Sequence, residues 1–442
     1  MTRAEFLTEE IRRIDGTIPN PMNSKHSKMA TSPFVFFRGT AQLFYADLRA
    51  QRIKLPEAFN QMPLTCVLGD CHTSNFGFIT EEGSHGDTVI FAPNDFDDAC
   101  VGVAGWDILR FLISLALVVE HCQGARTGKY DAPQVDPDKP SVEPDQVVNA
   151  MHSFLQSYLD TCTELVDFPE AIYRTLNHFP DSSALHKCYS KACRRAAGGE
   201  DFTAKSALAK SIEFGEDGLR FRRKEPKFIK LAPHLYQQLS WNFSPYMDDA
   251  VIDVVERTDS GTGSVNMERF YFLVGPARPH TEASFARCHI VEVKAQRLAA
   301  PLHYFDELHP VNRLNPAHLT ARCQKRMQRR PDLLLDEVEW QNKHWLIRSR
   351  HHAKVGIGPQ DIAAGRKNVN GGFNEYARWC GQALCLAHCR GDRRSTLLEQ
   401  AMVRHLANAI PSLIETALDY ALQVLEDHSW LVARLEAGKS MG

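Results

Sequence analysis

Residues 67–77 read Val-Leu-Gly-Asp-Cys-His-Thr-Ser-Asn-Phe-Gly, and residues 94–99 read Asn-Asp-Phe-Asp-Asp-Ala. The first stretch places Asp70 and Asn75 in an Asp-x-x-x-x-Asn frame. A short apolar run precedes each stretch, at 64–68 and at 89–92, and each run is typical of a buried strand. The two stretches therefore predict polar loops, each of which directly follows a strand.

The residue types in these loops fit one kind of chemistry. Transfer of a phosphoryl group from ATP needs a carboxylate beside the attacking hydroxyl, and an amide oxygen and a second carboxylate that hold magnesium on the phosphates. Asp70 is the candidate base, and Asn75 is a candidate magnesium ligand. In the acidic cluster Asp95 is the first choice as metal ligand, and the neighbouring Asp97 is a further candidate ligand, because magnesium prefers one or two carboxylates.

Each loop also has an ordinary interpretation. Asp70 and Asn75 could make only the hydrogen bonds of a turn, and residues 94–98 could form an exposed acidic turn. Phe96 lies within the acidic cluster, and apolar residues precede it, so we expect this segment to be partly buried. Buried carboxylates without a cation or donors are costly, which favours the functional interpretation.

A second candidate site lies about 190 residues further on. Gly261-Thr262-Gly263-Ser264 separates two predicted strands, 251–255 and 270–274, and Lys294 ends a third at 289–294. Backbone N–H groups of Gly261, Gly263 and Ser264 could bind phosphates, although a plain hairpin turn would show the same residues. Lys294 is out of step with Val291 and Val293, so we expect it on the opposite face of its strand, where it could pair with phosphates.

The remaining pattern predicts an α+β protein. Apolar residues recur at helical spacing over 40–50, from Gly105 to about residue 121, over 147–165, over much of 168–215, and from 377 onward. Asp107 is placed as the N-cap or first-turn acid of the second of these helices. Residues 123–145 predict a surface loop, and 345–348 a further strand.

Composition excludes several classes of protein. The chain has 442 residues, a net charge of −3 and 43% apolar residues, which gives no sign of nucleic-acid or membrane binding. Its 12 cysteines show no repeated C-x-x-C spacing and are interpreted as buried apolar side chains or free thiols. Residues 1–10 lack an apolar signal core, so a cytoplasmic protein is expected.

His72 allows a rival interpretation. Asp70 and His72 form an Asp-x-His pair, which can hold a catalytic metal in a hydrolase. A structural or hydrogen-bonding role for His72 is the alternative.

These motifs, taken in order, resemble the bacterial family known as domain of unknown function 2252 and, more distantly, the kinase-like fold of the aminoglycoside and choline phosphotransferases. The closer resemblance spans most of the chain and rests on Met29 to Phe34, Phe37 to Gly39, Gly69 to His72, Asn75 to Gly77, Asn94 to Asp97, Trp106-Asp107, Gly261 to Ser264, and Val293-Lys294.

The likeness to phosphotransferases implies Asp70 as catalytic base, Asn75 and Asp95 on magnesium, Lys294 on the phosphates of ATP, and Asp107 as a brace of the catalytic loop. The chain departs from their pattern, since Leu68 replaces a usual histidine and Asn266 a third glycine. The glutamate that usually pairs with the strand lysine is not identifiable, and Glu307 is one candidate.

The motif order is also reversed, because the catalytic loop precedes the glycine hairpin. Circular permutation of a two-lobed kinase-like fold would explain this. Residues 1–215 would form the first part of a helical lobe, 216–350 a small antiparallel β-rich nucleotide lobe, and 351–442 the C-terminal helices that pack back on the helical lobe. Residues 379–388 resemble the helix that normally precedes a kinase catalytic loop.

The expected function is therefore ATP- and magnesium-dependent phosphotransfer to a hydroxyl of an unidentified small molecule or protein. The alternatives are a nucleotide-binding pseudokinase, a kinase-like protein that transfers AMP, and a metal-dependent hydrolase.

Overall fold

The computed structural model describes residues 1–215, 218–223, 226–258, 267–277, 282–392 and 395–439. It is 54% helical and 16% strand. All strand pairs among the described residues are antiparallel. The predicted α+β class is therefore confirmed.

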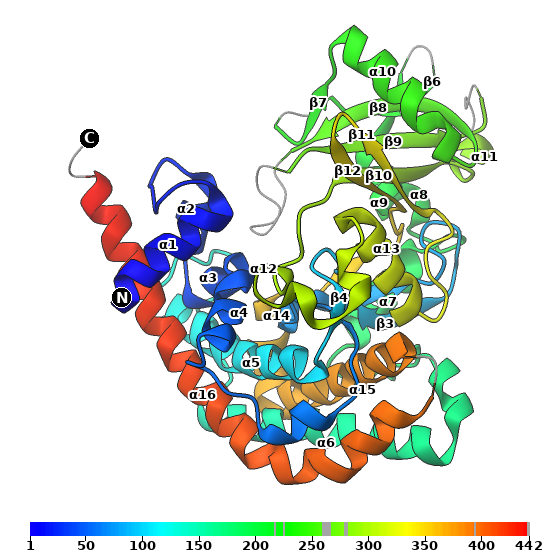
Figure 1. Cartoon of the computed structure of the whole chain (residues 1–442). Coiled ribbons are helices and arrows are strands. Elements are labelled where there is room, and N and C mark those ends of the chain that lie inside the picture. Colours follow the sequence, from blue (N-terminus) through cyan, green and yellow to red (C-terminus); the bar gives the residue numbers. More distant parts are fainter. Residues whose placement is uncertain (216–217, 224–225, 259–266, 278–281, 393–394, 440–442) are drawn as a thin grey trace.

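A six-stranded sheet forms one end of the molecule (Figure 1). Its strand order is β11 (Leu335–Trp340), β12 (Lys343–Ser349), β10 (His289–Ala295), β9 (Arg269–Gly275), β8 (Ala250–Arg257) and β7 (Phe228–Lys230). The strands predicted at 251–255, 270–274, 289–294 and 345–348 are confirmed as β8, β9, β10 and β12. The pattern did not predict β7, β11 or the separate hairpin of β5 (Ile212–Gly215) and β6 (Gly218–Phe221).

The two faces of β10 have different neighbours. Val291 and Val293 are buried in one apolar cluster with Phe243 of α10 (Pro233–Phe243), which covers that face. Lys294 contacts Asp97 of the acidic cluster instead. The alternation predicted for this strand is therefore present.

Four long helices build the opposite end of the molecule: α5 (Ala104–Arg126), α6 (Asp145–Asp167), α15 (Phe373–Asp392) and α16 (Leu397–Lys439). The predicted helices at 105–121, 147–165 and from 377 onward are confirmed. A Cβ at Gly381 would lie 2.3 Å from the carbonyl oxygen of Phe154, so this glycine allows α15 to approach α6 closely. Helix α5 is long and apolar enough to cross a membrane, but 78% of its apolar window is buried inside the fold.

The remaining helices are shorter and lie in both parts of the molecule. They are α1 (Arg3–Asp15), α2 (Ser24–Met29), α3 (Pro33–Gly39), α4 (Ala41–Arg49), α7 (His186–Arg195), α8 (Phe202–Lys205), α9 (Ala207–Ser211), α11 (Glu282–Phe285), α12 (Leu302–Phe305), α13 (Pro316–Met327) and α14 (Pro359–Ala363). Helix α4 confirms the prediction for 40–50. The prediction for 168–215 was only partly right, because residues 174–185 contain no helix and the strand β5 begins at Ile212.

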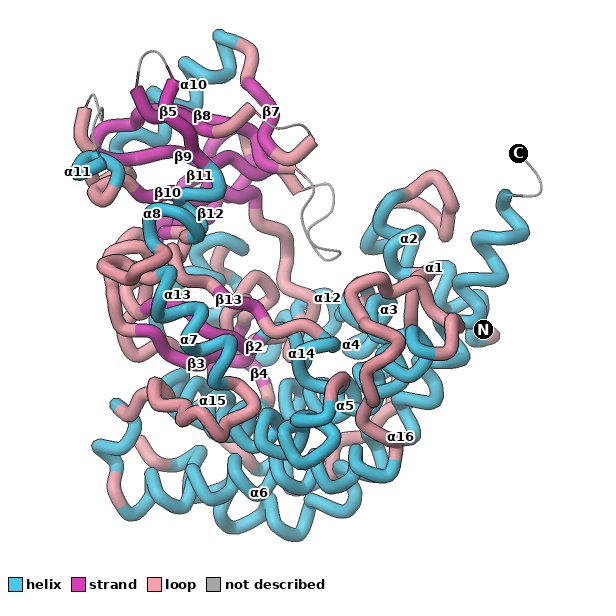
Figure 2. Tube along the Cα trace, turned by 180° about the vertical axis from the view of Figure 1, so that it is seen from behind, coloured by secondary structure: helices cyan, strands magenta, loops and turns pink. Residues whose placement is uncertain are grey.

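Two small sheets lie between the large sheet and the long helices (Figure 2). One pairs β1 (Thr65–Val67) with β4 (Cys100–Gly102), and the other has the order β13 (Val355–Gly356), β2 (Phe76–Thr80), β3 (Val89–Pro93). Strands β1 and β3 confirm the two predicted apolar strands. The loops that follow them carry the two polar motifs, so these sheets position the candidate site.

Candidate functional site

The loop after β1 is fixed by a buried carboxylate. Asp107, in the first turn of α5, accepts hydrogen bonds from the backbone N–H groups of Leu68 (2.6 Å) and Gly69 (3.1 Å). Nε2 of His388 on α15 lies 3.0 Å from the same carboxylate. Gly69 has φ = +78°, and a Cβ there would lie 2.0 Å from the carbonyl oxygen of Asp98, so the turn requires glycine.

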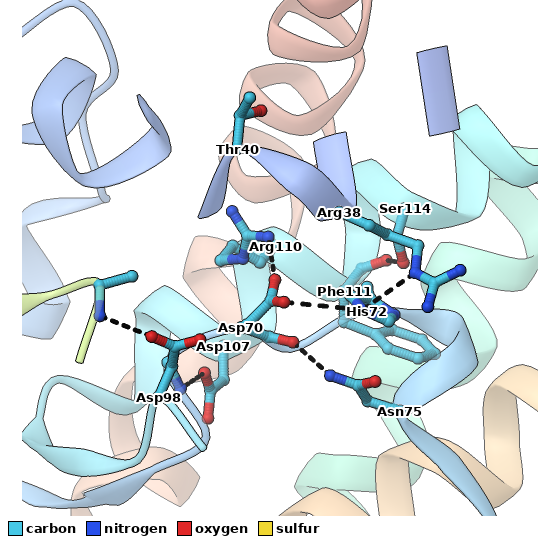
Figure 3. Close-up of polar contacts among 12 residues, drawn as sticks. Arg38, Thr40, Asp70, His72, Asn75, Asp98, Asp107, Arg110, Phe111 and Ser114 are labelled. Atoms are coloured by element: carbon cyan, nitrogen blue, oxygen red, sulfur yellow. Dashed lines mark hydrogen bonds and ion pairs between the residues drawn. The ribbon is translucent and has the colours of Figure 1, made fainter. Parts of the chain in front are cut away.

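Asp70 follows this turn and is paired with an arginine (Figure 3). Nη2 of Arg110, on α5, lies 2.5 Å from Oδ1 of Asp70, while the aspartate side chain remains 19% exposed. Burial raises the pKa of Asp70 to about 6, Arg110 opposes the rise, and the nearby Asp98 and Asp95 add to it. A carboxylate with this pKa can exchange a proton near neutral pH.

His72 is held by two donors beside Asp70. Its Nε2 lies 3.3 Å from Nε of Arg38, and its Nδ1 lies 3.2 Å from the backbone nitrogen of Ser74. Burial and the charges of Arg38 and Arg110 lower the pKa of His72 well below its usual range. A neutral imidazole has one unprotonated nitrogen, so it can accept only one of these two bonds at a time.

The amide of Asn75 has a defined orientation. Its Nδ2 donates to the carbonyl oxygen of Asp70 at 2.7 Å (Figure 3). The backbone carbonyl of Asn75 accepts from the N–H of Asn94 at 3.0 Å, which joins the two motifs at the start of the β2–β3 ladder. Because the nitrogen of the amide is committed to the loop, its oxygen is the atom available to a cation.

The three aspartates of the second motif have different surroundings. Asp98 is buried and accepts from Arg297 (3.1 Å) and from the backbone N–H of Ala300 (2.8 Å). Asp97 contacts Lys294 and lies 3.4 Å from Nη1 of Arg348. Burial alone would raise the pKa of Asp97, but Lys294 and Arg348 hold it well below its usual range.

Asp95 has no ion-pair partner within 4.0 Å among the described residues. Burial and the neighbouring charge of Asp97 raise its pKa, while Lys294 opposes the rise. An aspartate in these surroundings is the member of the cluster that a metal ion would stabilise most.

Lys294 reaches the acidic cluster from the large sheet. Its side chain is 1% exposed, and its carboxylate partner is Asp97, 197 residues away in the chain. Glu307, the candidate partner, lies exposed in a short turn at Asp306–Leu308, so that suggestion was wrong. Glu292, two residues before Lys294, instead pairs with Arg348 (2.8 Å) and Arg269 (3.4 Å).

The predicted glycine hairpin, with Gly261, Gly263 and Ser264, lies outside the described residues. The flanking strands are described, and Arg269, the first residue of β9, is in register with Lys294 of β10. The connection between β8 and β9 therefore leaves the sheet beside the end of β10 that carries Lys294.

A cavity of about 200 Å³ lies beside the acidic cluster. Its lining includes carboxylates and several cationic side chains: Asp95, Asp97, Arg269, Arg348, Arg350 and Lys354. Because side chains of both charges line this cavity, it suits an anionic ligand that binds together with a cation.

Arg110 and Arg348 were not singled out from the sequence as site residues, whereas Arg38 was a candidate for lining a site near the Asp70 loop. Arg110 interrupts an otherwise apolar helix, and it lies three residues after Asp107, on the same face. An arginine in such a run needs a buried acid, which was a usable signal. Arg38 is packed over Phe34, and Arg348 gave no comparable signal because it lies on a strand with mixed polarity.

Fold and site together define an α+β protein in which a large antiparallel sheet delivers a buried lysine to an acidic loop beside a paired aspartate. The chain belongs to the family described as "Uncharacterized protein conserved in bacteria (DUF2252)", which matches residues 17–434. No curated protein and no solved structure matches the chain.

Proposed function

We propose that this protein is a phosphotransferase that uses ATP and magnesium to phosphorylate a hydroxyl of a small molecule or protein. The observation that carries the proposal is the contact of Lys294 with Asp97, which joins the sheet to the loop motifs. Asp70 and Asn75 lie at the same loop cluster, since Asn75 bonds both Asp70 and Asn94. These are the groups that phosphoryl transfer requires.

Each group has one role in this proposal. Asp70 accepts or orients the proton of the attacking hydroxyl. Asn75 and Asp95 hold magnesium through oxygen atoms, and Asp97 keeps Lys294 in place beside the phosphates. Gly261, Gly263 and Ser264 would contribute backbone N–H groups from the β8–β9 connection.

We further propose that the fold is a circularly permuted, two-lobed kinase-like fold in the cytoplasm, with 216–350 as the nucleotide lobe. The spatial relation of α15 to the catalytic loop supports this. Oγ1 of Thr65, at the start of β1, donates to the carbonyl of His388 at 2.5 Å, although 323 residues separate them. The last turns of α15 therefore lie beside the start of the strand that leads into the catalytic loop. This is the position that residues 351–442 would have in the unpermuted chain order.

The surroundings of His72 disfavour the hydrolase alternative. Both of its ring nitrogens face donors, Arg38 and the N–H of Ser74, and its pKa is lowered by burial and by two arginines. A metal ion would have to compete with a guanidinium for the imidazole, which is electrostatically unfavourable.

The test is calorimetric titration of ATP, with and without magnesium, on wild type, Lys294→Ala and Asp95→Asn. Lys343→Ala is the matched control, because Lys343 is a surface strand lysine paired with Glu268. We expect magnesium-dependent binding in wild type and Lys343→Ala, and its loss in the two site variants. A wild-type protein that fails to bind ATP would reject the proposal.

Turnover separates the remaining alternatives. Asp70→Asn should abolish nucleotide turnover and leave ATP affinity nearly unchanged if Asp70 is the base. Release of ADP indicates phosphoryl transfer, and release of pyrophosphate indicates AMP transfer. Nucleotide binding without turnover in wild type, tested across candidate acceptors, would identify a pseudokinase.

A further inference from the structure

Two histidines and an aspartate meet at a second place, away from the candidate site. His85 lies in the turn between β2 and β3, Asp248 lies two residues before the start of β8, and His289 is the first residue of β10. Their ligand atoms all lie within 4.8 Å of one another. His289 and Lys294 are five residues apart on one strand, which corresponds to about 16 Å, so this cluster is separate from the Lys294 site.

The geometry converges on one carboxylate. Nε2 of His85 lies 2.6 Å from Oδ2 of Asp248, and Nε2 of His289 lies 2.8 Å from Oδ1. The two imidazole centroids are 4.7 Å apart. His289 is 8% exposed, while His85 and Asp248 are 26% and 36% exposed, so one side of the cluster is packed and the other is open to solvent.

The charges also suit a cation. Within the described part of the chain, both ion-pair partners of Asp248 are histidines, and no lysine or arginine lies within 4.0 Å of it. Two imidazoles and a carboxylate that meet without a neighbouring ammonium or guanidinium group offer a divalent cation nitrogen and oxygen ligands.

We propose that His85, Asp248 and His289 bind a divalent transition-metal ion of the Zn²⁺ type. Two imidazoles and one carboxylate suit zinc, and three protein ligands leave a position for water on the exposed side. Magnesium, which prefers oxygen ligands, is a poor occupant of this set. The inference does not depend on the proposed phosphotransferase activity.

A metal at this position would connect two separate parts of the fold. His85 belongs to the turn that leads through β3 into the acidic cluster, and His289 begins the strand that ends near Lys294. Asp248 precedes β8, whose connection to β9 contains the glycine hairpin. The ion would therefore restrain the large sheet relative to the β2–β3 turn, and it would stabilise the folded protein by mass action.

The experiment titrates Zn²⁺ and Co²⁺ into the full chain after treatment with a chelator, without nucleotide. We expect one high-affinity ion per chain in wild type. We also expect a cobalt absorption spectrum of nitrogen and oxygen ligation, without the sulfur-to-cobalt band that cysteine binding would produce. His85→Ala and Asp248→Asn should each weaken Zn²⁺ binding by at least about tenfold, since even outer-shell changes cost that much.

His318→Ala is the matched control. His318 also lies on the surface, 3.1 Å from a carboxylate (Glu337), but among the described residues it belongs to no group of three potential metal ligands. It should leave the Zn²⁺ affinity unchanged. In chelator all variants should keep the wild-type circular dichroism, and Zn²⁺ should raise the Tm of wild type but not of His85→Ala. Stoichiometric binding that survives in the His85→Ala, Asp248→Asn double variant, or no binding in wild type, would overturn the proposal.

Discussion

At the residue scale, the most informative group is Asp70. Burial raises the pKa of this carboxyl, Arg110 lowers it, and the nearby Asp98 and Asp95 raise it again. The pKa of about 6 is the result of this balance. Arg110 has its own support, since it lies over the rings of Phe37 (4.3 Å) and Phe44 (5.2 Å). These aromatic residues are buried in the core and also hold the arginine that is paired with Asp70.

If Asp70 is the base, kcat/KM for nucleotide turnover should fall below a pH of about 6, because the protonated carboxyl cannot accept a proton. Arg110→Met removes the main charge that lowers the pKa of Asp70, so this pKa should increase by about one unit. The acid limb of the profile, the pH range over which kcat/KM falls, should then move to higher pH by the same amount. The measurement is the pH dependence of kcat/KM for both proteins. Arg404→Met, a change on the exposed surface of α16, should leave the limb in place. An acid limb that does not move in Arg110→Met would argue against Asp70 as the base.

A second residue-scale prediction concerns Gly69. Gly69→Ala should destabilise the protein by at least about 3 kcal/mol, because the added Cβ combines a positive φ with a clash against the backbone of Asp98. Gly16→Ala separates the two causes, since Gly16 has φ = +71° but open space around it. That control should cost only about 1 kcal/mol. Urea unfolding of both variants gives the comparison, and equal losses would show that the clash is relieved by local movement.

At the scale of elements, the loop after β1 that carries Asp70 is held between helices that are distant in sequence. Asp107 of α5 binds the loop and His388 of α15, and the other ring nitrogen of His388 lies 2.9 Å from the hydroxyl of Tyr158 on α6. Three helices thus fix one turn. This arrangement explains why the acid in the first turn of α5 serves the loop as well as its own helix.

The contact of α16 with α15 contains an unusual carboxyl group. Glu399 is buried, and its Oε2 has no hydrogen-bond partner among the residues that the structure describes. Burial and the neighbouring Cys389 raise its pKa to about 8. Because the pKa is raised in the folded state, the contribution of Glu399 to stability is complete below its unfolded pKa of about 4.5 and is lost as the pH rises through 8.

Glu399→Gln should remove this loss, since glutamine stays neutral at every pH. The variant should therefore be more stable than wild type by about 2 kcal/mol at alkaline pH, and the difference should vanish near pH 4.5. Urea unfolding across this pH range measures the effect. Glu415→Gln, at an exposed position of the same helix, should follow the wild-type curve.

At the scale of the whole molecule, helix α1 near the start of the chain crosses the last part of α16 (Figure 1). Nε of Arg3 in α1 lies 2.9 Å from Oδ1 of Asp427 in α16. Termini that lie close together make a change of chain order tolerable. The proposed permutation therefore requires no change in the packing of the elements.

This can be tested by reordering the chain. A permutant that begins at Gly199, continues to Gly442, passes through a flexible linker and ends at Gly198 restores the ordinary order of motifs. It should fold, keep the Tm of wild type within a few degrees and bind ATP with magnesium, because the opening lies in a surface turn. A permutant opened between Cys385 and Leu386, in the buried middle of α15, should not fold. Failure of both chains would contradict the tolerance inferred from the position of the termini.

Much of the architecture could be predicted from the pattern of residues. The strands around Lys294 and the long helices have strong periodicity, and the structure contains them with small shifts of their ends. The weak elements were missed, because β7 and β13 have only three and two residues, and their backbone partners come from distant segments. The helix content of 168–215 was overestimated for a related reason. The helices there are short, and packing against distant segments decides where they end.

The sequence by itself determined which residues could do chemistry and the order in which they occur. Local rules suffice for this, because the residue type sets the functional group and the strand period sets the side of Lys294. Only the tertiary structure decided the partners: Asp97 for Lys294, Arg110 for Asp70, and the meeting of His85, Asp248 and His289. The hydrogen-bonded pairs among these residues are 40 to 197 positions apart in the chain. The contacts therefore depend on how whole elements pack, and no local pattern encodes that packing.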